Sequence, residues 1–373
     1  MMPAPDRIAI IGLGLLGASL AEASRRQWPG LRISGVSSPA TLGKALEAGL
    51  VDETRHYSDV DAAVAGCDLV FLCTPIDHIK GVLAGWAHSR PAWKVGCVVS
   101  DVGSTKAGIC ALGRAALPPD HPQGAVFIGS HPMAGSEKTG LEARDPLLFQ
   151  NASWVLCPEA DAPEAAVEKL QVFVESLGAR TTRMDSRLHD AVAAHVSHLP
   201  QLLSIALASY IGGRETVVEN CLQIAGAGFR DMTRLAGSSF GVWEPILKSN
   251  LAEVRGVAAG FRRHWENLEA SLDRDMGAAG FHEANRLRGQ LSTGKKGFSM
   301  PLMEILVDLE DKPGVLLRAL QPLAENGLNV QDLEILKVRE GEAGTLMMAF
   351  RRTEDARAAL DLLAAEGFRA RPR

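Results

Sequence analysis

The sequence R-I-A-I-I-G-L-G-L-L-G, from Arg7 to Gly17, decides the fold of this chain. Its apolar first half predicts a strand, and a helical pattern follows from Ala18 to Arg26. In such a strand-turn-helix unit, the first glycine permits a tight turn, the second lets a pyrophosphate approach, and the third lets the helix pack on the strand. Free N–H groups at the helix start then attract phosphates. The alternative is a glycine-rich turn in some other α/β protein. The predicted cofactor-binding residues here are Gly12, Gly14, Leu15, Leu16 and Gly17.

The end of the second predicted strand, Leu31 to Val36, bears on the choice of cofactor. NAD-binding folds usually have Asp or Glu about twenty residues after the last glycine, where it binds the ribose hydroxyls. This chain has Ser37 and Ser38 there, so no carboxylate repels a 2′-phosphate and two hydroxyls can bind one. We therefore favour NADP over NAD. No arginine follows Ser37 directly, and Lys44, one turn further on, is a poorer candidate for the phosphate.

Strand and helix patterns alternate up to Met184 and predict an open parallel sheet. Three predicted strands end in polar residues: Thr74-Pro75, the segment D-V-G-S-T-K (Asp101 to Lys106), and a segment that begins at Gly129. Ligands of such sheets bind at the carboxyl ends of the strands. We therefore expect these three strand ends, including Thr74 and Pro75 as cofactor contacts, to form one site.

The third of these segments, G-S-H-P-M-A-G-S-E-K-T-G from Gly129 to Gly140, is predicted to be a loop. It combines His131 with small residues and with the acid-base pair Glu137 and Lys138. A histidine acts readily as a general base near neutral pH. The alternative is a surface turn in which His131 only caps a neighbouring backbone group.

From Ser186 to about residue 300, the pattern is that of long helices, with no strand signal. The segment H-V-S-H-L-P-Q places Ser197 between His195 and His198, but no carboxylate or cysteine completes a metal-ligand set, so we predict no metal site. Pro200 frees a backbone carbonyl one turn earlier and predicts a distorted helix.

Two arginines in the same region, Arg230 and Arg234, lie four residues apart and are predicted to share one helical face. An ordinary exposed pair is the alternative to an anion site. A further long helix is predicted from about Pro245 to Ser271.

A segment rich in glycine, lysine and serine, 291–299, predicts a linker, and a βαββαβ pattern follows it. The last part includes strand patterns at Asn329 to Val338 and Gly344 to Arg351. We therefore predict three domains: residues 1–185 for the dinucleotide, residues 186–293 as a helical domain, and residues 300–373 as a small α/β domain.

The overall composition is that of a soluble globular protein, with 46% apolar and 22% charged residues among 373. The net charge of −5 and the absence of a basic block give no indication of nucleic acid or an anionic membrane as partner. Six scattered cysteines predict reduced thiols. Because no leader peptide and no long uninterrupted apolar run is evident, we expect a cytoplasmic protein without a membrane segment.

Five motifs in one order resemble the prephenate/arogenate dehydrogenases of tyrosine biosynthesis, with an ACT regulatory domain appended. They are I-I-G-L-G-L-L-G-A-S-L, D-V-G-S-T-K, G-S-H-P-M-A-G-S-E-K-T-G, H-V-S-H-L-P and G-F-R-D-M-T-R. The resemblance covers essentially the whole chain. It implies a Rossmann domain, a helical domain for substrate binding and dimerisation, and a ferredoxin-like ACT domain.

The resemblance also implies an activity, namely the NAD(P)-dependent oxidative decarboxylation of prephenate or arogenate. It implies that His131 polarises the substrate hydroxyl, that Ser104 shares this hydrogen bond, and that Arg234 binds the ring carboxylate. Ser197, His198 and Trp243 fall where the family lines its substrate pocket.

Gln201 departs from the family pattern, because members that prefer prephenate often have histidine directly after the S-H-L-P proline. Glutamine is neutral and both donates and accepts hydrogen bonds. This tilts the expected substrate towards arogenate or towards use of both compounds.

In the C-terminal part, D-K-P-G-V-L and N-V-Q-D-L-E-I resemble the amino-acid-binding turn and second strand of ACT domains. The resemblance implies tyrosine as a feedback inhibitor, bound where two ACT domains meet. The long apolar helices of the middle domain favour a homodimer. The implied regulatory residues are Asp311, Pro313, Gly314, Val315 and Asn329.

Two other functions remain open at this point. A different two-domain oxidoreductase, of the hydroxyacid or imine type, usually has a catalytic lysine or tyrosine in its helical region, and no lysine occurs here between Lys169 and Lys248. An amino-acid sensor with a relic nucleotide domain is the other alternative. The intact glycines, with Ser104 and His131, argue against it.

Overall fold

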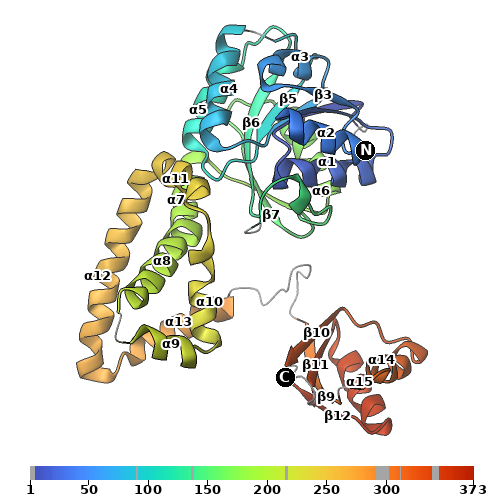
Figure 1. Cartoon of the computed structure of the whole chain (residues 1–373), viewed down its shortest axis with the longest axis vertical. Coiled ribbons are helices and arrows are strands. Elements are labelled where there is room, and N and C mark those ends of the chain that lie inside the picture. The colour runs from blue at the N-terminus through green and yellow to red at the C-terminus, as the bar shows by residue number, and fades with distance from the viewer. Residues whose placement is uncertain are drawn as a thin grey trace. The chain divides into compact units, whose positions relative to one another are not determined.

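The computed structural model describes residues 5–89, 91–135, 138–214, 217–290, 302–310, 312–337 and 344–373. These residues divide into two compact units, 1–273 and 274–373 (Figure 1). The predicted linker 291–299 lies outside the described residues. So do Glu137, Asp311 and Val338.

Within its described residues, the first unit contains an eight-stranded sheet in the order β3-β2-β1-β4-β5-β6-β7-β8. Strands β1 to β6 are parallel, β7 is antiparallel to β6, and β8 is parallel to β7. The strand order reverses between β1 and β4, which is where dinucleotides bind in such sheets. The strands are β1 (Arg7–Ile11), β2 (Arg32–Val36), β3 (Glu53–Arg55), β4 (Leu69–Leu72), β5 (Val98–Asp101), β6 (Val126–Pro132), β7 (Ser153–Cys157) and β8 (Arg180–Arg183).

Helices cover both faces of this sheet, because successive residues of each inner strand bury side chains on opposite faces. Ile8 and Ile10 belong to the core under α1, α2 and α6, whereas Ala9 and Ile11 belong to the core under α3, α4 and α5. The helices are α1 (Leu15–Gln27), α2 (Pro39–Glu47), α3 (Val60–Val64), α4 (Ile76–Ser89), α5 (Ala107–Ala116) and α6 (Glu164–Ser176), with short turns η1 (Tyr57–Asp59) and η2 (Leu141–Ala143).

The helical part of the first unit begins with one continuous stretch that includes a π-helical turn. Pro200 lies in the first turn of the last helix of this stretch, and the π-helical turn comes directly before it. The distortion predicted from Pro200 is thereby confirmed, because proline cannot donate to the carbonyl one turn back. The elements are α7 (Ser186–Ala193), η3 (Ala194–His198), α8 (Leu199–Gly212), α9 (Val218–Ile224), α10 (Ala227–Thr233), η4 (Arg234–Gly237), α11 (Phe240–Ser249) and α12 (Leu251–Asp275).

His131 lies on a strand, so the predicted loop from Gly129 to Gly140 is wrong in its first part. Residues Gly129 to Pro132 pair with Trp154 to Cys157 of β7. Small residues and proline favour a turn locally, but antiparallel pairing with β7 overrides that preference. The base candidate therefore stands on a rigid and buried element.

Two helix predictions are also corrected. The predicted helix from Pro245 to Ser271 is divided at Asn250 into α11 and α12. Asn250 leaves the helical conformation, and its side chain bonds to other parts of the unit. Arg230 and Arg234 do not share one α-helix, because α10 ends at Thr233 and Arg234 opens a 3-10 turn.

The second unit confirms the predicted βαββαβ pattern. Its sheet, antiparallel throughout, has the order β10-β11-β9-β12, and α14 and α15 pack on it around a core that includes Val307 and Phe350. The second strand starts at Asp332 and not at Asn329. The elements are α13 (Ala278–Gln290), β9 (Met303–Leu309), α14 (Val315–Glu325), β10 (Asp332–Lys337), β11 (Gly344–Phe350), α15 (Thr353–Ala365) and β12 (Arg369–Pro372).

Candidate active site

A histidine pair joins the nucleotide-binding sheet to the helical part. His131 Nδ1 lies 2.9 Å from His189 Nε2, and His189 Nδ1 lies 2.9 Å from Asp190 Oδ1. His131 is only 8% exposed. Burial, with the neighbouring His189, Lys106 and His198, lowers the pKa of His131 well below its ordinary value. His131 is therefore a neutral imidazole at physiological pH.

The Asp190 carboxylate determines which nitrogen of His131 is free. A carboxylate only accepts, so the His189 nitrogen that faces it, Nδ1, carries the hydrogen. When His189 is neutral, its Nε2 then accepts a hydrogen from His131 Nδ1. His131 is thereby left with a lone pair on Nε2. That is the nitrogen a general base requires.

Asp190 itself is anchored by the start of α5. It accepts backbone hydrogen bonds from Lys106 at 2.6 Å and from Ala107 at 2.9 Å. Burial alone raises the pKa of Asp190, but the hydrogen bonds from His189 and from these two N–H groups outweigh it and lower the pKa. The carboxylate therefore stays ionised and stabilises any positive charge on His189.

A second buried network fixes the backbone beside His131. Lys106 and Asp101 form an ion pair whose side chains are fully buried. Lys106 Nζ also donates to the carbonyl of Ser130 at 2.8 Å, and the Ser130 N–H donates to Asp101 Oδ1 at 3.1 Å. The segment D-V-G-S-T-K thus positions the strand that holds His131.

Helices α11 and α12 meet the site at Asn250, which is 5% exposed. Its Nδ2 donates to the Asp190 carbonyl at 2.8 Å and lies 3.3 Å from His198 Nδ1. His198 is buried, and burial lowers its pKa to about 4. The ring of Trp243 meets the His198 ring edge-on, with 6.0 Å between ring centres. The structure thus brings His198 and Trp243 together.

Gln201 connects α8 to the turn that carries Arg234. Its Nε2 donates to the Leu235 carbonyl at 2.9 Å, and Ser204 Oγ on the same helix accepts from the Ala236 N–H at 2.9 Å. Arg234 itself is exposed. The backbone that carries it is therefore held on α8 while its guanidinium stays in solvent.

Ser104 and Ser197, the two serines predicted to belong to the site, are held by fewer contacts than the histidines. Ser104 follows β5 and is half-buried, and Ser197 lies half-buried in η3 between its two histidines. Within the described ranges, neither hydroxyl makes a side-chain hydrogen bond. His195 is exposed and bonds to the Ala191 carbonyl at 2.8 Å, away from the histidine pair.

The glycine turn after β1 has the geometry that a pyrophosphate needs. Gly12 has a φ of +100°, and a Cβ on Gly17 would lie 1.9 Å from the Gly12 carbonyl oxygen. A Cβ on Gly14 would meet open space, so backbone there can approach a ligand. The residues present fit a dinucleotide cofactor.

Other predicted cofactor contacts lie at the same edge. Leu15 and Leu16 begin α1, Ser37 is buried and Ser38 is exposed at the end of β2, and Pro75 is exposed after β4. The Thr74 hydroxyl lies 3.1 Å from His78 Nδ1. Lys44 is paired with Glu142 at 3.1 Å.

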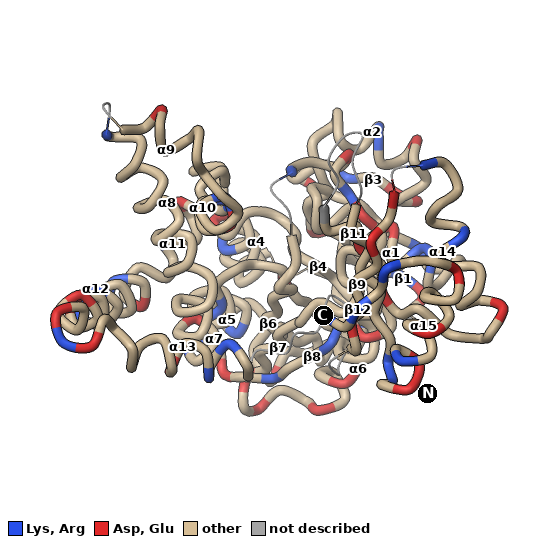
Figure 2. The backbone as a smooth tube through the Cα atoms, turned by 90° about the horizontal axis from the view of Figure 1, so that it is seen from below, with Lys and Arg blue, Asp and Glu red and all other residues tan. Residues whose placement is uncertain are grey.

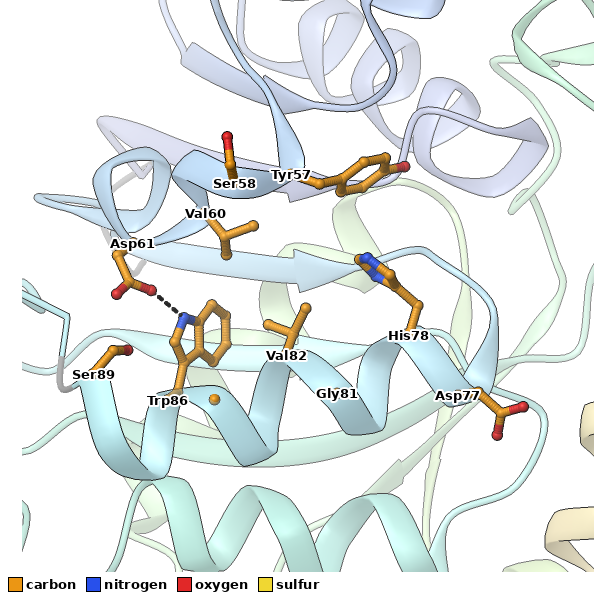
Figure 3. Close-up of a pocket in the computed structure, with 11 residues that line it drawn as sticks. Tyr57, Ser58, Val60, Asp61, Asp77, His78, Gly81, Val82, Trp86 and Ser89 are labelled. Atoms are coloured by element: carbon orange, nitrogen blue, oxygen red, sulfur yellow. Dashed lines mark hydrogen bonds between the residues drawn. The ribbon is translucent and has the colours of Figure 1, made fainter.

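A groove of about 530 Å³ runs along α4 from this edge (Figure 3). At one end the rings of Tyr57 and His78 meet edge to face, with 4.8 Å between their centres. At the other end Trp86 Nε1 donates to Asp61 Oδ1 at 2.9 Å. The sequence interpretation missed this groove, because its residues come from η1, α3 and α4.

His189, Asp190, Lys106 and Asn250 were also missed by the sequence interpretation. The adjacent residues His189 and Asp190 are a local signal, but nothing in their spacing links them to His131. A buried charge normally requires a partner of opposite charge. Asp101 directly follows an apolar strand, so the segment D-V-G-S-T-K was itself a signal for an ion pair, which the structure forms with Lys106.

In the second unit, the predicted regulatory turn has a left-handed glycine. Gly314 has a φ of +83° and caps the start of α14, with Pro313 exposed before it and Val315 half-buried after it. Asn329 is exposed ahead of β10. Asp311 lies outside the described residues.

One helical stretch in the described part of the chain, Ser186–Gly212, is long and apolar enough to cross a membrane by length and composition alone. It carries His189, Asp190 and His198, whose side chains or carbonyls bond to the nucleotide-binding part and to Asn250. These polar contacts are those of a helix in a folded bundle.

Three family models match the chain in succession. Residues 20–183 match "Prephenate dehydrogenase, nucleotide-binding domain", residues 185–284 match "Prephenate dehydrogenase, dimerization domain", and residues 303–367 match "ACT domain". The prephenate dehydrogenase of Bacillus subtilis is 30% identical over 94% of this chain and 93% of its own length. The cyclohexadienyl dehydrogenase of Zymomonas mobilis is 33% identical over 77% of this chain and 96% of its own length.

A solved structure, that of Synechocystis arogenate dehydrogenase, is 30% identical and has a TM-score of 0.62. The alignment covers 76% of this chain and 96% of that one. Fold and site thus define an NAD(P)-dependent oxidoreductase with an appended ACT domain. The chain belongs to the prephenate dehydrogenase family.

Proposed function

We propose that this chain catalyses the NAD(P)-dependent oxidative decarboxylation of prephenate to 4-hydroxyphenylpyruvate, or of arogenate to tyrosine. The observation that carries the proposal is the chain of contacts from His131 through His189 to Asp190. It supplies a buried, neutral imidazole with a free Nε2 on the nucleotide-binding domain of a family named for this reaction.

Oxidation of the ring carbon that carries the hydroxyl removes a hydride from this carbon and a proton from the hydroxyl oxygen. A bound nicotinamide would be the acceptor of the hydride, and the proton must go to a base. His131 Nε2 accepts that proton, and the hydrogen bonds through His189 to Asp190 hold the His131 ring in the tautomer that leaves Nε2 free. Ser104, which follows the neighbouring strand, shares the hydrogen bond to the hydroxyl and orients the nicotinamide.

The ring carboxylate needs a fixed cation until it leaves as CO₂. Arg234 supplies a planar guanidinium that can bind a carboxylate with two hydrogen bonds. Two hydrogen bonds hold its turn on α8, which supports this role. Ser197, His198 and Trp243 line the substrate pocket in this proposal.

Gln201 supports a preference for arogenate or the use of both substrates. Its Oε1 is buried and, among the described residues, has no hydrogen-bond partner, while its Nε2 is engaged by Leu235. A buried acceptor without a donor is costly. The ammonium group of arogenate can donate to such an oxygen, whereas the keto oxygen of prephenate only accepts.

We further propose NADP as the favoured cofactor over NAD, because Ser37 and Ser38 offer hydroxyls where NAD-binding folds have a carboxylate. Gly12, Gly14, Leu15, Leu16 and Gly17 would hold the pyrophosphate, and Thr74 and Pro75 would border the adjacent ribose. The reaction needs no metal ion in this proposal.

Tyrosine is the proposed regulator, bound at the Asp311 to Val315 turn with Asn329 nearby, where two ACT domains meet. The protein is proposed to be a cytoplasmic homodimer. Its functional regions are residues 1–185, 186–293 and 300–373. The two compact units of the structure divide at a different place from these regions, after residue 273 and inside α12.

The test is anaerobic incubation of the purified chain with prephenate or arogenate and with each cofactor, followed by the absorbance of the reduced nicotinamide. We expect turnover with at least one substrate, and a higher kcat/KM for arogenate if Gln201 meets an ammonium. No turnover with either compound would overturn the proposal.

A further inference from the structure

The carboxyl ends of β2 and β3 lie side by side at the edge where the cofactor binds. Val36 pairs with Arg55, and the Ser37 N–H donates to the Arg55 carbonyl at 3.3 Å. The residue after β2 is the one that contacts the adenosine ribose in dinucleotide-binding folds. Arg55 is therefore the lateral neighbour of that position, although it is eighteen residues away in the sequence.

The guanidinium of Arg55 is only weakly engaged. Its Nη1 donates to the carbonyl of the adjacent Thr54 at 3.2 Å, and its Nη2 lies 4.0 Å from Glu53. Glu53 is bound more closely by Arg7, at 2.8 Å. Because the Arg55 side chain is 44% exposed, it can turn towards a ligand without breaking a strong ion pair.

Lys44, which lies in α2, the helix after β2, is less suited than Arg55. It is paired with Glu142 at 3.1 Å, and that pair would have to open before its ammonium could bind a phosphate. A lysine also offers a point charge, whereas an arginine offers two parallel N–H groups to a phosphate.

Tyr57 follows Arg55 by two residues, and its ring meets the ring of His78 edge to face (Figure 3). His78 is linked to Thr74, at the end of β4. The chain therefore has aromatic rings suited to contact with a base and, two residues before Tyr57, a cation suited to a phosphate.

We propose that Arg55 binds the 2′-phosphate of NADP and is the residue by which this chain selects NADP over NAD. This inference rests on one part of the proposed function, namely that the chain binds a nicotinamide dinucleotide. NAD carries a neutral hydroxyl at this position, so Arg55 gains little from it. The 2′-phosphate is a dianion, and a guanidinium beside Ser37 binds it through charge-assisted hydrogen bonds.

The test compares two ligands that differ only in the 2′-phosphate, adenosine 2′,5′-bisphosphate and adenosine 5′-monophosphate. Their Kd values are measured by calorimetry on the full chain, without substrate and without turnover. We expect the wild type to bind the bisphosphate more tightly. Arg55→Gln should weaken the bisphosphate by roughly tenfold to a hundredfold, the scale of a hydrogen bond between charged groups, and leave the monophosphate unchanged.

Two matched variants serve as controls. Arg32→Gln removes an exposed arginine from the opposite end of β2, and Lys44→Gln removes the competing cation. Both should leave the preference unchanged. Equal weakening of both ligands by Arg55→Gln, a selective loss in Lys44→Gln, or equal wild-type affinity for the two ligands would each overturn the inference. Because no turnover is measured, these outcomes are independent of whether the proposed reaction occurs.

Discussion

His131 and His189 differ from ordinary surface histidines because they are buried and form a hydrogen bond to each other instead of to water. Burial holds the His131 imidazole neutral, because its charged form would lose the stabilisation that water provides. Because Asp190 fixes the tautomer of His189, the hydrogen-bond chain also fixes which nitrogen of His131 is free. The ability of His131 to act as a base thus depends on His189 and Asp190 and not on His131 alone.

His131→Asn should lower kcat by about 10²-fold or more, which is the usual scale for losing an acid-base group. Asparagine cannot take up the hydroxyl proton. Steady-state kinetics measures the effect, and the Kd of the cofactor should change little, since the glycine turn is intact. Unchanged turnover would refute the role of His131 as base.

The second residue-scale prediction concerns His189. His189→Ala should lower kcat about tenfold or more, because His131 loses the acceptor that fixes its tautomer. His189→Gln, whose amide oxygen can accept that hydrogen, should recover part of the loss. His195→Ala, which removes an exposed histidine from the same helical stretch, should behave like the wild type.

The pH profile separates this positioning role from a merely structural one. The pKa of His131 is lowered, so its base form persists as the pH falls through the ordinary histidine range. Wild-type kcat/KM should therefore stay flat down to about pH 6.5, the ordinary histidine pKa, and fall only below it. In His189→Ala the acid limb should move to higher pH, because a neighbour that lowers this pKa is gone. If the pH profiles of the wild type and of His189→Ala have the same midpoint, the proposed effect of His189 on His131 is wrong.

Arg234→Gln should raise the KM for the substrate strongly and lower kcat less. A carboxylate anchor acts in the ground state and the transition state alike. Arg230→Gln is the matched control, since Arg230 is also exposed and bonds to the Ala225 carbonyl at 3.3 Å. If the large KM effect appears in Arg230→Gln instead, the anchor is Arg230.

At the scale of elements, strand β6 and helix α5 act together. Antiparallel β7 extends the parallel sheet beyond β6 and keeps His131 in a strand, while the first N–H groups of α5 hold Asp190. The fold thus uses a strand end and a helix start to hold two groups from different parts of the chain.

Removal of the ACT domain, residues 299–373, should leave a working enzyme with weaker inhibition by tyrosine. The domain has its own core, and the catalytic residues proposed here all lie before residue 274. Inhibition curves with tyrosine measure the effect. The full-length variant Asn329→Ala should show a smaller loss of inhibition. If tyrosine inhibits the truncated enzyme as strongly as the full chain, it acts at the active site.

At the scale of the whole molecule, the helical part exposes many large apolar side chains, a pattern that marks interaction surfaces. Helix α8 carries no charged residue and is tan along its length in Figure 2. Large side chains nearby are also exposed, with Leu222 at 61%, Ile224 at 85% and Phe240 at 71%. A second copy of the chain is the occupant that we propose for this surface.

Light scattering should therefore give a mass of about 80 kDa, twice the 39.8 kDa of one chain. Ile224→Glu together with Phe240→Glu should shift the protein towards the monomer, because charges oppose burial of an apolar face. Val95→Glu, at a residue that is 82% exposed on the nucleotide-binding domain, is the matched control. A wild-type mass near 40 kDa would contradict the dimer.

The sequence by itself determined the fold class, because that depends on periodic apolar residues and on glycines whose backbone roles are local. The strand, turn and helix at Arg7 to Gln27 and the βαββαβ pattern of the last part needed no distant partner to be predicted. The ordered motifs likewise identified the family, since each is a contiguous run of residues.

Only the tertiary structure decided what sets the pKa and the tautomer of His131 and which side chain lies beside Ser37. His189 meets His131 across more than fifty residues, and Arg55 meets Ser37 through the pairing of two strands. Such contacts follow from how strands and helices pack together, and no spacing in the sequence encodes them. For this reason the sequence predicted a loop histidine and an unassigned phosphate position, whereas the structure has a buried base candidate and a nearby guanidinium.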